Sequence, residues 1–515
     1  MKKPTIQDII GQTLVIGFDG TTVRKETEAF IKEYKIGNII LFARNMGSPE
    51  EIRALTSHLQ QIGKESGQSK PLLIAVDQEN GIVRRIDDGT TTVPGAMALA
   101  ATGNPQHAYD MYKITAKELR SLGINWNLAP VLDVNNNPNN PVIGVRSFGE
   151  DANIVAQFGE KALQGLQAGG MITAVKHFPG HGDTDVDSHL GMPVISHSLE
   201  RLHEIELVPF KKSIECGTDV VMTAHIHFPA LDARAHIPAT LSYPIMTNFL
   251  RRDLSYNGLV TTDDMEMDAI SKSIGTEKGC VEALLAGVDL VMISHTLSKQ
   301  IGTIDEIKKA VSAKKLSEER LYESYCRIQK VKQKLLDKEI RRPINYSQHQ
   351  KQAQAVYRES VTLEKGIEQL PITSHSARIL VIEPPASTQT GAEDPQYAKA
   401  AIGRAILTFK PDASVVQMPL SEVDLLAIHE RYDAIIIGLL SASVQEDQRQ
   451  LVEKLVETEI PIHVVAMRSP YDIQHVPDAI ASYINTYEFS YPALEVAAAA
   501  LFGKIQLTGT SPVTL

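Results

Sequence analysis

One stretch shows the fold class most clearly: Leu259-Val-Thr-Thr262, then Glu277-Lys-Gly-Cys-Val-Glu-Ala-Leu-Leu-Ala286, then Val288-Asp-Leu-Val-Met-Ile293. The first and last runs are short and almost continuously apolar, which is typical of strands buried on both faces of a parallel sheet. The middle run is long enough for a helix and ends at Gly287, a residue that commonly follows a helix C-terminus. The stretch therefore predicts a strand–helix–strand unit with parallel strands.

The same alternation continues over more than 300 residues. Apolar runs predict eight strands, at residues 14–18, 39–42, 72–76, 124–128, 172–176, 220–224, 259–262 and 288–293. Helical patterns between them fall at residues 26–34, 49–63, 108–122, 154–168, 200–216, 243–254 and 277–286. Eight such units predict an α/β fold with a closed (β/α)₈ TIM barrel over residues 1–335. An open, doubly wound sheet of the same length is the alternative.

A second, smaller domain is predicted after the barrel. Residues 316–360 are charged and helical in period, so we interpret them as a connector, with residues 336–364 as a helical linker. The strand pattern then resumes at 377–382, 413–417, 434–439, 462–466 and 481–485, and a closing helix is expected at 491–501. This order predicts a three-layer, flavodoxin-like α/β domain over residues 365–515.

Composition excludes several classes of protein. The chain has 515 residues, of which 43% are hydrophobic and 22% charged, as in ordinary globular proteins. A net charge of −11 argues against a nucleic-acid partner. Cys216, Cys280 and Cys326 form no C-x-x-C pair, so neither a disulfide framework nor a zinc knuckle is indicated. Without a signal-like or membrane-length apolar segment, we expect a cytoplasmic protein with no membrane partner; its oligomeric state stays open.

Polar residues follow several of the predicted barrel strands. Asp77-Gln-Glu-Asn-Gly81 follows the third strand, Lys176-His-Phe-Pro-Gly-His-Gly182 the fifth, His225-Ile-His227 the sixth and Asp263-Asp264 the seventh. The carboxyl ends of barrel strands meet at one face, which is where TIM barrels carry their active sites. These residues are therefore expected to converge on one pocket.

The segment from Lys176 to His189 contains three histidines and three aspartates. Two glycines and a proline predict a loop there. A metal site would suit this composition, but Phe178-Pro-Gly180 prevents the helical His-x-x-x-His geometry, so we expect no metal and no cofactor. The pair Asp187-x-His189 favours acid/base chemistry instead, because the carboxylate can orient the imidazole and stabilise its charged form.

Asp263 follows the seventh strand directly and can face the barrel mouth, as the nucleophile of a retaining glycosidase does. The alternative interpretation is structural. In that case the aspartates would cap a helix over residues 264–270.

These motifs together resemble a known family. Lys176-His-Phe-Pro-Gly-His-Gly-Asp183 with Asp187-Ser-His189, Asp77-Gln-Glu79, Asn140-Pro-Val-Ile-Gly-Val-Arg-Ser-Phe-Gly149 and Val260-Thr-Thr-Asp-Asp264 are similar to the two-domain β-N-acetylglucosaminidases of glycoside hydrolase family 3. The motifs occur in the family's order and cover roughly residues 5–340. One departure is Ile82, which stands where the family usually has an arginine and puts fine substrate preference in doubt.

The resemblance implies roles for individual residues. Asp263 matches the nucleophile that forms a covalent glycosyl-enzyme, and His189, oriented by Asp187, matches the acid/base. The residues that match the family's sugar-binding positions are Asp77, Arg85, Arg146, Lys176 and His177. Residues expected close behind them are Asp133, His181 and His225.

The implied activity is that of a retaining exo-β-N-acetylglucosaminidase. Its carbohydrate substrate would be a peptidoglycan fragment, as in peptidoglycan recycling, or an oligosaccharide from chitin degradation. Alternatives within the family are a phosphorylase, which transfers the sugar to phosphate, and a β-glucosidase, which usually takes its acid/base carboxylate from a later domain. A metal-dependent hydrolase and an inactive sugar-binding protein are alternatives of other classes.

Overall fold

A computed structural model describes residues 4–86, 89–185, 187, 191–336, 343–372, 377–397, 401–420, 428 and 430–515. Its N-terminal part is a closed barrel in which β1 pairs with both β2 and β8, so the predicted barrel is confirmed and the open sheet is wrong. All eight strands run parallel in sequence order. The strands are β1 Leu14–Ile16, β2 Asn38–Leu41, β3 Leu73–Val76, β4 Trp126–Asn127, β5 Ile172–Phe178, β6 Val220–Thr223, β7 Leu259–Asp264 and β8 Leu290–Ile293.

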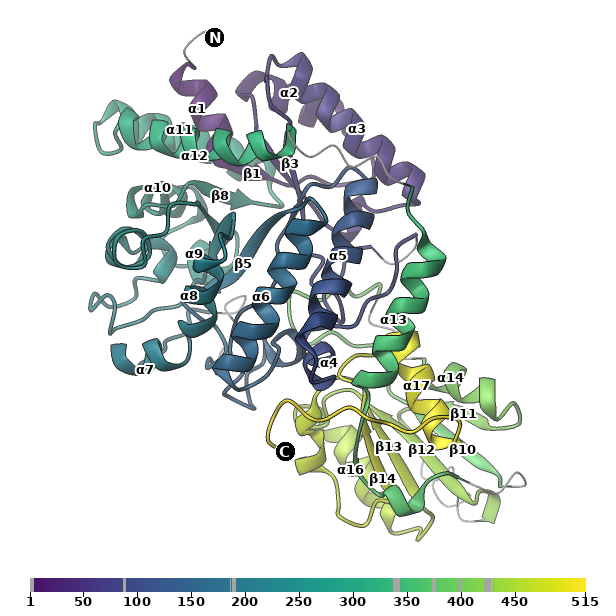
Figure 1. Ribbon diagram of the computed structural model, residues 1–515. Coiled ribbons are helices and arrows are strands. Elements are labelled where there is room, and N and C mark those ends of the chain that lie inside the picture. Colours follow the sequence, from purple (N-terminus) through teal and green to yellow (C-terminus); the bar gives the residue numbers. More distant parts are fainter. Residues whose placement is uncertain are drawn as a thin grey trace.

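Helices surround the barrel (Figure 1). The α-helices are α1 Ile6–Thr13, α2 Lys25–Tyr34, α3 Pro49–Glu65, α4 Ala96–Ala101, α5 Pro105–Ser121, α6 Ala152–Ala168, α7 Leu199–Glu204, α8 Val208–Glu215, α9 Asp268–Ser271, α10 Thr276–Ala286, α11 Leu297–Ser312 and α12 Glu318–Leu336. A π-helix spans Pro244–Asp253, and short 3₁₀ turns occur at Ala43–Asn45, Gly144–Arg146 and Ala239–Leu241. Their N-termini often follow the expected capping rules, as at Ser48, whose side chain accepts a hydrogen bond from the Glu51 N–H.

Two details at the strand ends differ from the sequence prediction. β5 continues to Phe178, two residues beyond the predicted end at residue 176, so His177 and Phe178 lie on the strand rather than in the following loop. β7 continues to Asp264 and the next helix is only Asp268–Ser271, so the alternative interpretation, in which a helix spans residues 264–270, is wrong. Both differences have the same cause: polar side chains at a barrel mouth continue the strand hydrogen bonding while breaking the apolar pattern.

Helix α12 closes the bottom of the barrel and is not a connector. Its Ile328, Val331 and Leu335 belong to the same buried cluster as the side chains inside the barrel. Lys332 is fully buried and donates hydrogen bonds to Gln12 Oε1 (2.8 Å) and to the Gly37 carbonyl (2.7 Å). Burial, together with nearby Lys70, lowers the pKa of Lys332 to about 7. The charged pattern that suggested a connector is the outer face of this helix.

The second domain is a six-stranded sheet in the order β11-β10-β12-β13-β14-β9. The five parallel strands have the flavodoxin-like order, with the first strand between the second and third. The predicted domain lacked β9, which pairs antiparallel with β14 at the edge of the sheet. The strands are β9 Thr362–Lys365, β10 Ile379–Glu383, β11 Ser414–Gln417, β12 Ala434–Leu439, β13 Ile462–Ala466 and β14 Ser482–Asn485. The helices are α13 Tyr346–Ser360, α14 Ile402–Phe409, α16 Glu446–Val456 and α17 Tyr491–Leu501, and 3₁₀ turns occur at Ile367–Gln369 and Pro470–His475.

The two domains share one buried apolar cluster. Barrel residues Ile82, Val83 and Met97 pack in it with Tyr357 of α13 and with side chains of the second domain. Figure 1 shows α13 running beside α5 toward the second sheet, and the C-terminal segment crossing back to the barrel. That segment is bonded to the barrel, since the Thr510 N–H donates to the Ala101 carbonyl at 2.9 Å. The domains therefore meet through a packed interface.

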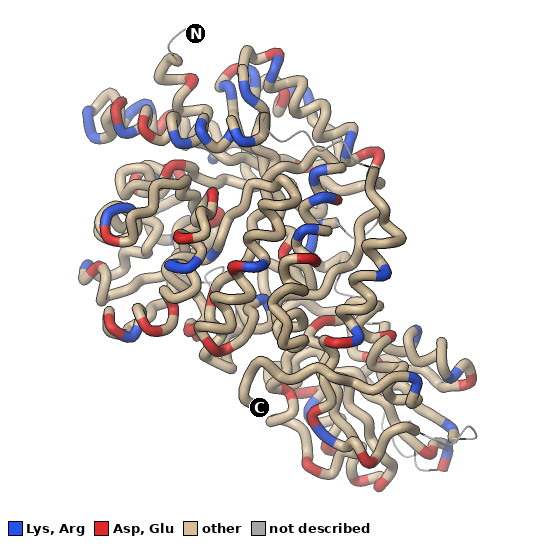
Figure 2. The backbone as a smooth tube through the Cα atoms, viewed as in Figure 1, with Lys and Arg blue, Asp and Glu red and all other residues tan. Residues whose placement is uncertain are grey.

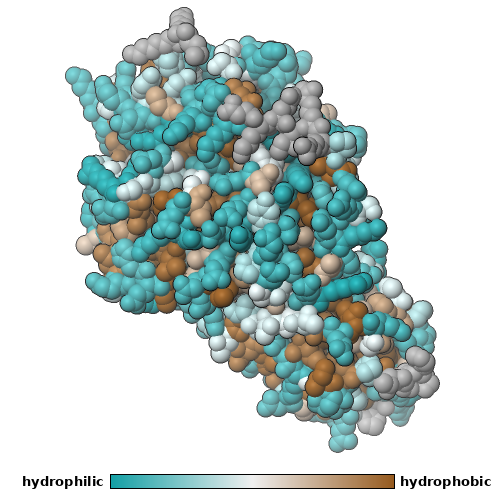
Figure 3. Space-filling model, in the orientation of Figure 1, coloured by the Kyte–Doolittle hydropathy of each residue, from teal (hydrophilic) through white to brown (hydrophobic). Residues whose placement is uncertain are grey.

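The face of the molecule shown in Figures 2 and 3 carries mixed charges and many hydrophilic side chains. On the face shown in Figure 2, basic and acidic residues are interspersed along the outer helices of the barrel and gather into no large basic patch among the coloured residues. Hydrophilic side chains cover most of the barrel in the same view (Figure 3). Among the described helices, none has the length and apolar character needed to cross a membrane.

Candidate active site

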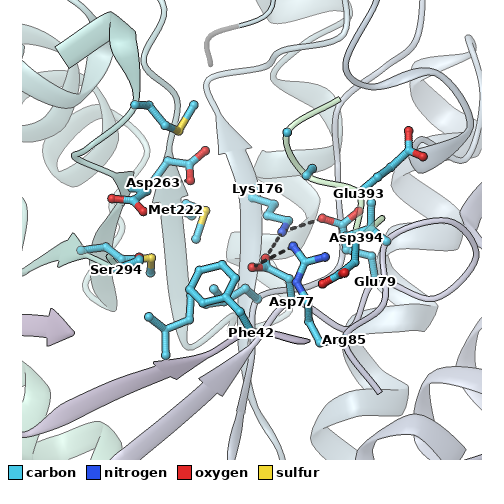
Figure 4. Close-up of a pocket in the computed structure, with 18 of the residues that line it drawn as sticks. Phe42, Asp77, Glu79, Arg85, Lys176, Met222, Asp263, Ser294, Glu393 and Asp394 are labelled. Atoms are coloured by element: carbon cyan, nitrogen blue, oxygen red, sulfur yellow. Dashed lines mark hydrogen bonds and ion pairs between the residues drawn. The ribbon is translucent and has the colours of Figure 1, made fainter. Parts of the chain in front are cut away.

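A cavity of about 620 Å³ opens at the carboxyl ends of the barrel strands. It is lined by six of the predicted site residues, which are Asp77, Arg85, Arg146, Lys176, His177 and Asp263. Asp77 and Arg85 follow β3, Lys176 and His177 lie near the end of β5, and Asp263 lies one residue before the end of β7. The strand-end geometry thus places side chains from distant parts of the sequence in one cavity (Figure 4).

A buried ionic network forms one side of the cavity. Lys176 Nζ lies 2.6 Å from both Asp77 Oδ1 and Glu79 Oε1. Arg146 contacts both carboxylate oxygens of Glu79, at 2.9 and 2.8 Å. Burial opposes the charge on each group, but the partners outweigh it: Arg146 and Lys176 hold the pKa of Glu79 well below its usual value, and Asp77 and Glu79 raise the pKa of Lys176. The network is therefore charged and rigid.

Arg85 has hydrogen-bonding capacity left for a ligand. It is only 5% exposed, and its Nη2 lies 3.8 Å from Asp77 Oδ2. Its Nε and Nη1 atoms are buried without a hydrogen-bond partner in the part of the chain that the structure describes. Unpaired buried donors are costly, which makes them informative when they line a cavity. A sugar hydroxyl or amide oxygen would satisfy them.

His177 is oriented from behind by Asp133. Its Nδ1–H donates to Asp133 Oδ2 at 2.7 Å, and Asp133 Oδ1 accepts from the backbone N–H groups of His177 and His181. Burial disfavours the Asp133 carboxylate, but His177 outweighs this effect and lowers its pKa. The bond on Nδ1 leaves Nε2 as the ring nitrogen available to a ligand.

His181 and His225 have different surroundings. His181 lines the cavity, and burial, reinforced by His177, lowers its pKa to about 4, so the ring is neutral at pH 7. His225 bonds to Thr240 Oγ1 through Nδ1 and to the Asp264 carbonyl through Nε2, and it is not among the described residues that line the cavity. Its contacts support the β6 and β7 strand ends.

Of the expected acid/base pair, the structure describes Asp187 but not His189. Asp187 is buried, at 7% exposure, and does not belong to the described lining of the cavity. His189 lies outside the described residues. The first part of their segment is held from below by Asn140, whose Nδ2 donates to the His181 and Gly182 carbonyls at 2.9 Å.

The histidines and aspartates of this segment do not share one metal site in the described residues. His177 is paired with Asp133, and His181 Nδ1 bonds to Thr184. Of this segment, Asp183 belongs to a cluster in which its ligand-type atom and those of His197 and Glu206 lie within 4.8 Å of one another. Arg201 contacts both carboxylate oxygens of Glu206, at 3.0 and 2.8 Å, and already neutralises that group.

Sequence reasoning missed part of the lining. Glu79 was visible in the Asp77-Gln-Glu79 motif, but its role as the centre of the ionic network was not. Glu393 and Asp394 come from the second domain, from the loop after β10, where no motif marks them. Ile82 does not line this cavity; it packs in the apolar cluster that the two domains share.

Comparisons with known proteins agree with this geometry. The model of the glycosyl hydrolase family 3 N-terminal domain matches residues 5–331, more than half of the chain. The chain belongs to glycosyl hydrolase family 3. The resemblance seen in the sequence is thereby confirmed, and the protein is a glycoside hydrolase of the β-N-acetylhexosaminidase type.

Three relatives illustrate the similarity within family 3. The chain is 32% identical to beta-hexosaminidase A of Pseudoalteromonas piscicida, over 96% of this chain and 92% of the relative. It is 29% identical to a beta-N-acetylglucosaminidase/beta-glucosidase of Cellulomonas fimi, over 87% and 84% of the two chains. The solved structure of a family 3 beta-N-acetylglucosaminidase from Paenibacillus sp. str. FPU-7 superposes with a TM-score of 0.93 at 35% identity and covers 99% of both chains.

Proposed function

We propose that this family 3 enzyme is a retaining exo-β-N-acetylglucosaminidase that forms a covalent glycosyl-enzyme on Asp263 and transfers the sugar to water. The observation that carries the proposal is the position of Asp263 at the end of β7, in the same cavity as the charged network of Asp77, Glu79 and Lys176. A carboxylate at a barrel mouth, facing fixed polar groups, suits nucleophilic attack on a held sugar.

The reaction then has two steps. In the first, Asp263 attacks the anomeric carbon while His189, as imidazolium, protonates the departing oxygen, which leaves as an alcohol. In the second, neutral His189 removes a proton from water, the water oxygen attacks the anomeric carbon, and the bond to Asp263 breaks. Asp187 orients His189 and stabilises its charged form in both steps.

The network residues hold the sugar. The Asp77 carboxylate accepts hydrogen bonds from vicinal hydroxyls, and Arg85 donates from Nε and Nη1, which have no partner in the described structure. Arg146 and Lys176 lower the pKa of the buried Glu79 carboxylate, so that it remains an ionised acceptor. His177 presents Nε2, because Asp133 occupies its other nitrogen.

The charges around the cavity favour water over phosphate as the acceptor. Its described lining includes the carboxylates of Asp77, Glu79, Asp263, Asp264, Glu266, Asp268, Glu393 and Asp394, but only the cationic side chains of Arg44, Arg85, Arg146 and Lys176. Excess negative charge stabilises the positive charge that develops on the sugar in the transition state. The same charge repels an anionic acceptor.

The natural substrate that we propose carries a terminal, non-reducing β-N-acetylglucosamine, on either a chitin oligosaccharide or a peptidoglycan fragment. A cytoplasmic location is supported by the free Cys326 thiol, which is exposed.

The experiment that tests the proposal compares aryl β-N-acetylglucosaminide with aryl β-glucoside, with and without phosphate. We expect kcat/KM to favour the N-acetylated substrate by at least about 10²-fold, because a site that hydrogen-bonds an amide is left unpaired without it. Phosphate should not accelerate turnover, and Asp263→Asn should lower kcat by about 10⁴-fold, since no covalent intermediate can form. Comparable efficiency on both substrates would contradict the substrate assignment, and an active Asp263→Asn variant would contradict the nucleophile.

A second candidate is a β-glucosidase with a carboxylic acid as its acid/base. Glu393 and Asp394 favour it, because both come from the second domain and line the cavity. Figure 4, however, shows them across the cavity from Asp263, whereas the acid/base of a retaining enzyme must lie near the nucleophile. If Glu393 were the acid, Glu393→Gln would lower kcat/KM mainly for substrates with poor leaving groups. We expect Glu393→Gln instead to change kcat/KM by the same factor for good and poor leaving groups.

A further inference from the structure

The second domain supplies part of the cavity wall. Five described residues of the segment after β10 line the cavity, namely Gly391, Ala392, Glu393, Asp394 and Gln396. No sequence motif predicted a role for this domain in the reaction, and the nucleophile, the charged network and the predicted sugar-binding residues all belong to the barrel. This wall faces one particular part of a bound substrate.

The wall stands opposite the nucleophile. Asp263 ends β7, and the loop that carries Asp77, Glu79 and Arg85 follows β3, four strands away around a closed barrel of eight. In Figure 4, Glu393 and Asp394 lie on the side where these β3 residues gather, and Asp263 lies on the other. A sugar whose anomeric carbon contacts Asp263 therefore directs its opposite end, with the C4 and C6 hydroxyls, toward the second domain.

The wall segment is firmly held. Glu393 and Arg468 form an ion pair of 2.5 Å with side chains only 1% and 3% exposed, and Arg468 also donates to the Ser387 carbonyl. The Tyr397 hydroxyl donates to the Arg85 carbonyl at 3.0 Å, and the Arg84 guanidinium lies over the Tyr397 ring. The segment is thus bonded to the loop that carries the sugar-binding residues.

Two groups on this side still have hydrogen-bonding capacity. Arg85 keeps two buried N–H donors without a described partner. Asp394 is half-buried, and the hydrogen bond found for its side chain in the described structure is a long one of 3.4 Å, from the Gln396 N–H to Oδ1. A donor and an acceptor on the same side of the cavity suit a sugar hydroxyl, since it donates one hydrogen bond and accepts others.

We infer that residues 389–397 of the second domain form the wall at the non-reducing end of the sugar site, and that Asp394 accepts a hydrogen bond from the C4 or C6 hydroxyl of the terminal sugar. The inference rests on the proposed function, because Asp263 as nucleophile fixes the direction of the sugar. We expect a wall at this end to exclude a further sugar on C4. The second domain therefore makes the enzyme act from the chain end.

The first experiment follows aryl β-chitobioside with the wild-type protein. A closed non-reducing end requires removal of the terminal N-acetylglucosamine before the aryl alcohol can be released, so we expect a lag in aryl release and free N-acetylglucosamine as the first product. Immediate aryl release together with intact chitobiose would overturn the wall. Activity on aryl β-N-acetylglucosaminide would be retained in that case, so this outcome would contradict the wall and the exo mode of action but neither Asp263 as nucleophile nor the preference for N-acetylglucosamine.

The second experiment tests Asp394 with deoxy substrates. We expect Asp394→Ala to lower kcat/KM on aryl β-N-acetylglucosaminide by about 10- to 100-fold, the range for a hydrogen bond to a charged acceptor. On either the 4-deoxy or the 6-deoxy analogue the variant should equal the wild type, and the analogue that removes the difference identifies the hydroxyl. Asp394→Asn, which keeps an acceptor oxygen, should lose less.

The matched control is Asp478→Ala, in the same domain, because Asp478 is fully exposed, pairs with Lys365 and does not line the cavity. It should match the wild type on every substrate. An equal loss for Asp394→Ala on all three substrates, or no loss on any, would overturn the contact between Asp394 and the sugar.

Discussion

At the scale of single residues, the assignment of His189 as the acid/base can be tested with substrates that differ in their leaving group. His189→Ala should slow glycosylation far more for poor leaving groups than for activated aryl glycosides, because a good leaving group needs little protonation. Asp187→Ala should show the same pattern more mildly. The measurement is kcat/KM across a series of aryl N-acetylglucosaminides of graded leaving-group pKa. A slope that is the same in variant and wild type would mean that His189 only shapes its loop.

His181 gives the protein a predicted sensitivity to acid. Burial and the neighbouring His177 lower its pKa to about 4, whereas an unfolded chain has the ordinary value near 6.5. Between these two values the unfolded state binds a proton and the folded state does not. The free energy of unfolding should therefore fall as the pH drops from 6.5 to 4, by about 3 kcal/mol from this group alone.

His181→Gln should remove this contribution. The measurement is urea unfolding of both proteins at several pH values, with the difference between them plotted against pH, so that titration of the other groups cancels. A difference that does not change between pH 6.5 and 4 would show that His181 is protonated equally in both states.

At the scale of elements, the strand ends carry the ionic network, and Glu79 is its centre. Glu79→Gln removes the charge that faces both Arg146 and Lys176 in a site only 4% exposed. Breaking a buried pair in this way leaves uncompensated charge and costs about 3–5 kcal/mol. The control is Glu28→Gln, whose partner Lys32 lies on the surface of α2. Such an exposed pair contributes about 0–1 kcal/mol, so equal shifts of the two unfolding midpoints would contradict the buried network.

Elements were also the level at which the sequence was most informative. Apolar runs such as 288–293 located all eight barrel strands, because strands covered on both faces leave an unmistakable pattern. β9 could not be found in this way, since it lies at a sheet edge and three of its four residues are only partly buried. The end of β5 was placed two residues early because the polar His177 interrupts the apolar run, although the strand continues through it to Phe178.

The site residues also fall into two groups, those that the strand pattern predicts and those that it does not. Asp77, Lys176 and Asp263 follow strands, so topology alone brings them together. Glu393 and Asp394 reach the cavity through the packing of one domain on the other, which no local pattern encodes. Ile82, a departure from the family motif, turned out to lie in the apolar cluster that the domains share.

At the scale of the whole molecule, Glu488 links the domains. Its carboxylate accepts hydrogen bonds from the Gly95 N–H at 2.7 Å and from the Tyr357 hydroxyl at 2.6 Å. The two barrel segments beneath it pack closely: Gly81 has a φ of +62°, and a Cβ there would lie 2.7 Å from the Gly95 Cα. Glu488 thus holds the loop after β3, which also carries Asp77 and Arg85.

Glu488→Ala should lower the free energy of unfolding by about 1–3 kcal/mol for each buried donor that it leaves unpaired. Urea unfolding followed by fluorescence and by activity measures the change. The control is Glu495→Ala. Glu495 is half-buried on α17 and accepts a hydrogen bond from Gln354 of α13, which lies outside the barrel. A Glu488→Ala variant as stable as this control would mean that Glu488 does not hold the domains together.

The helix across the bottom of the barrel also constrains how the chain can fold during synthesis. Lys332 bonds to Gln12 and Gly37, residues separated from it by 320 and 295 positions, and Arg327 and Lys334 pair with Asp289 and Asp219. At about 5–20 residues per second, a ribosome needs roughly 16–64 s to travel from Gln12 to Lys332. During that interval α12 is not yet present to cover the bottom of the first barrel strands. The nascent barrel therefore stays incomplete until α12, its last helix, has left the exit tunnel.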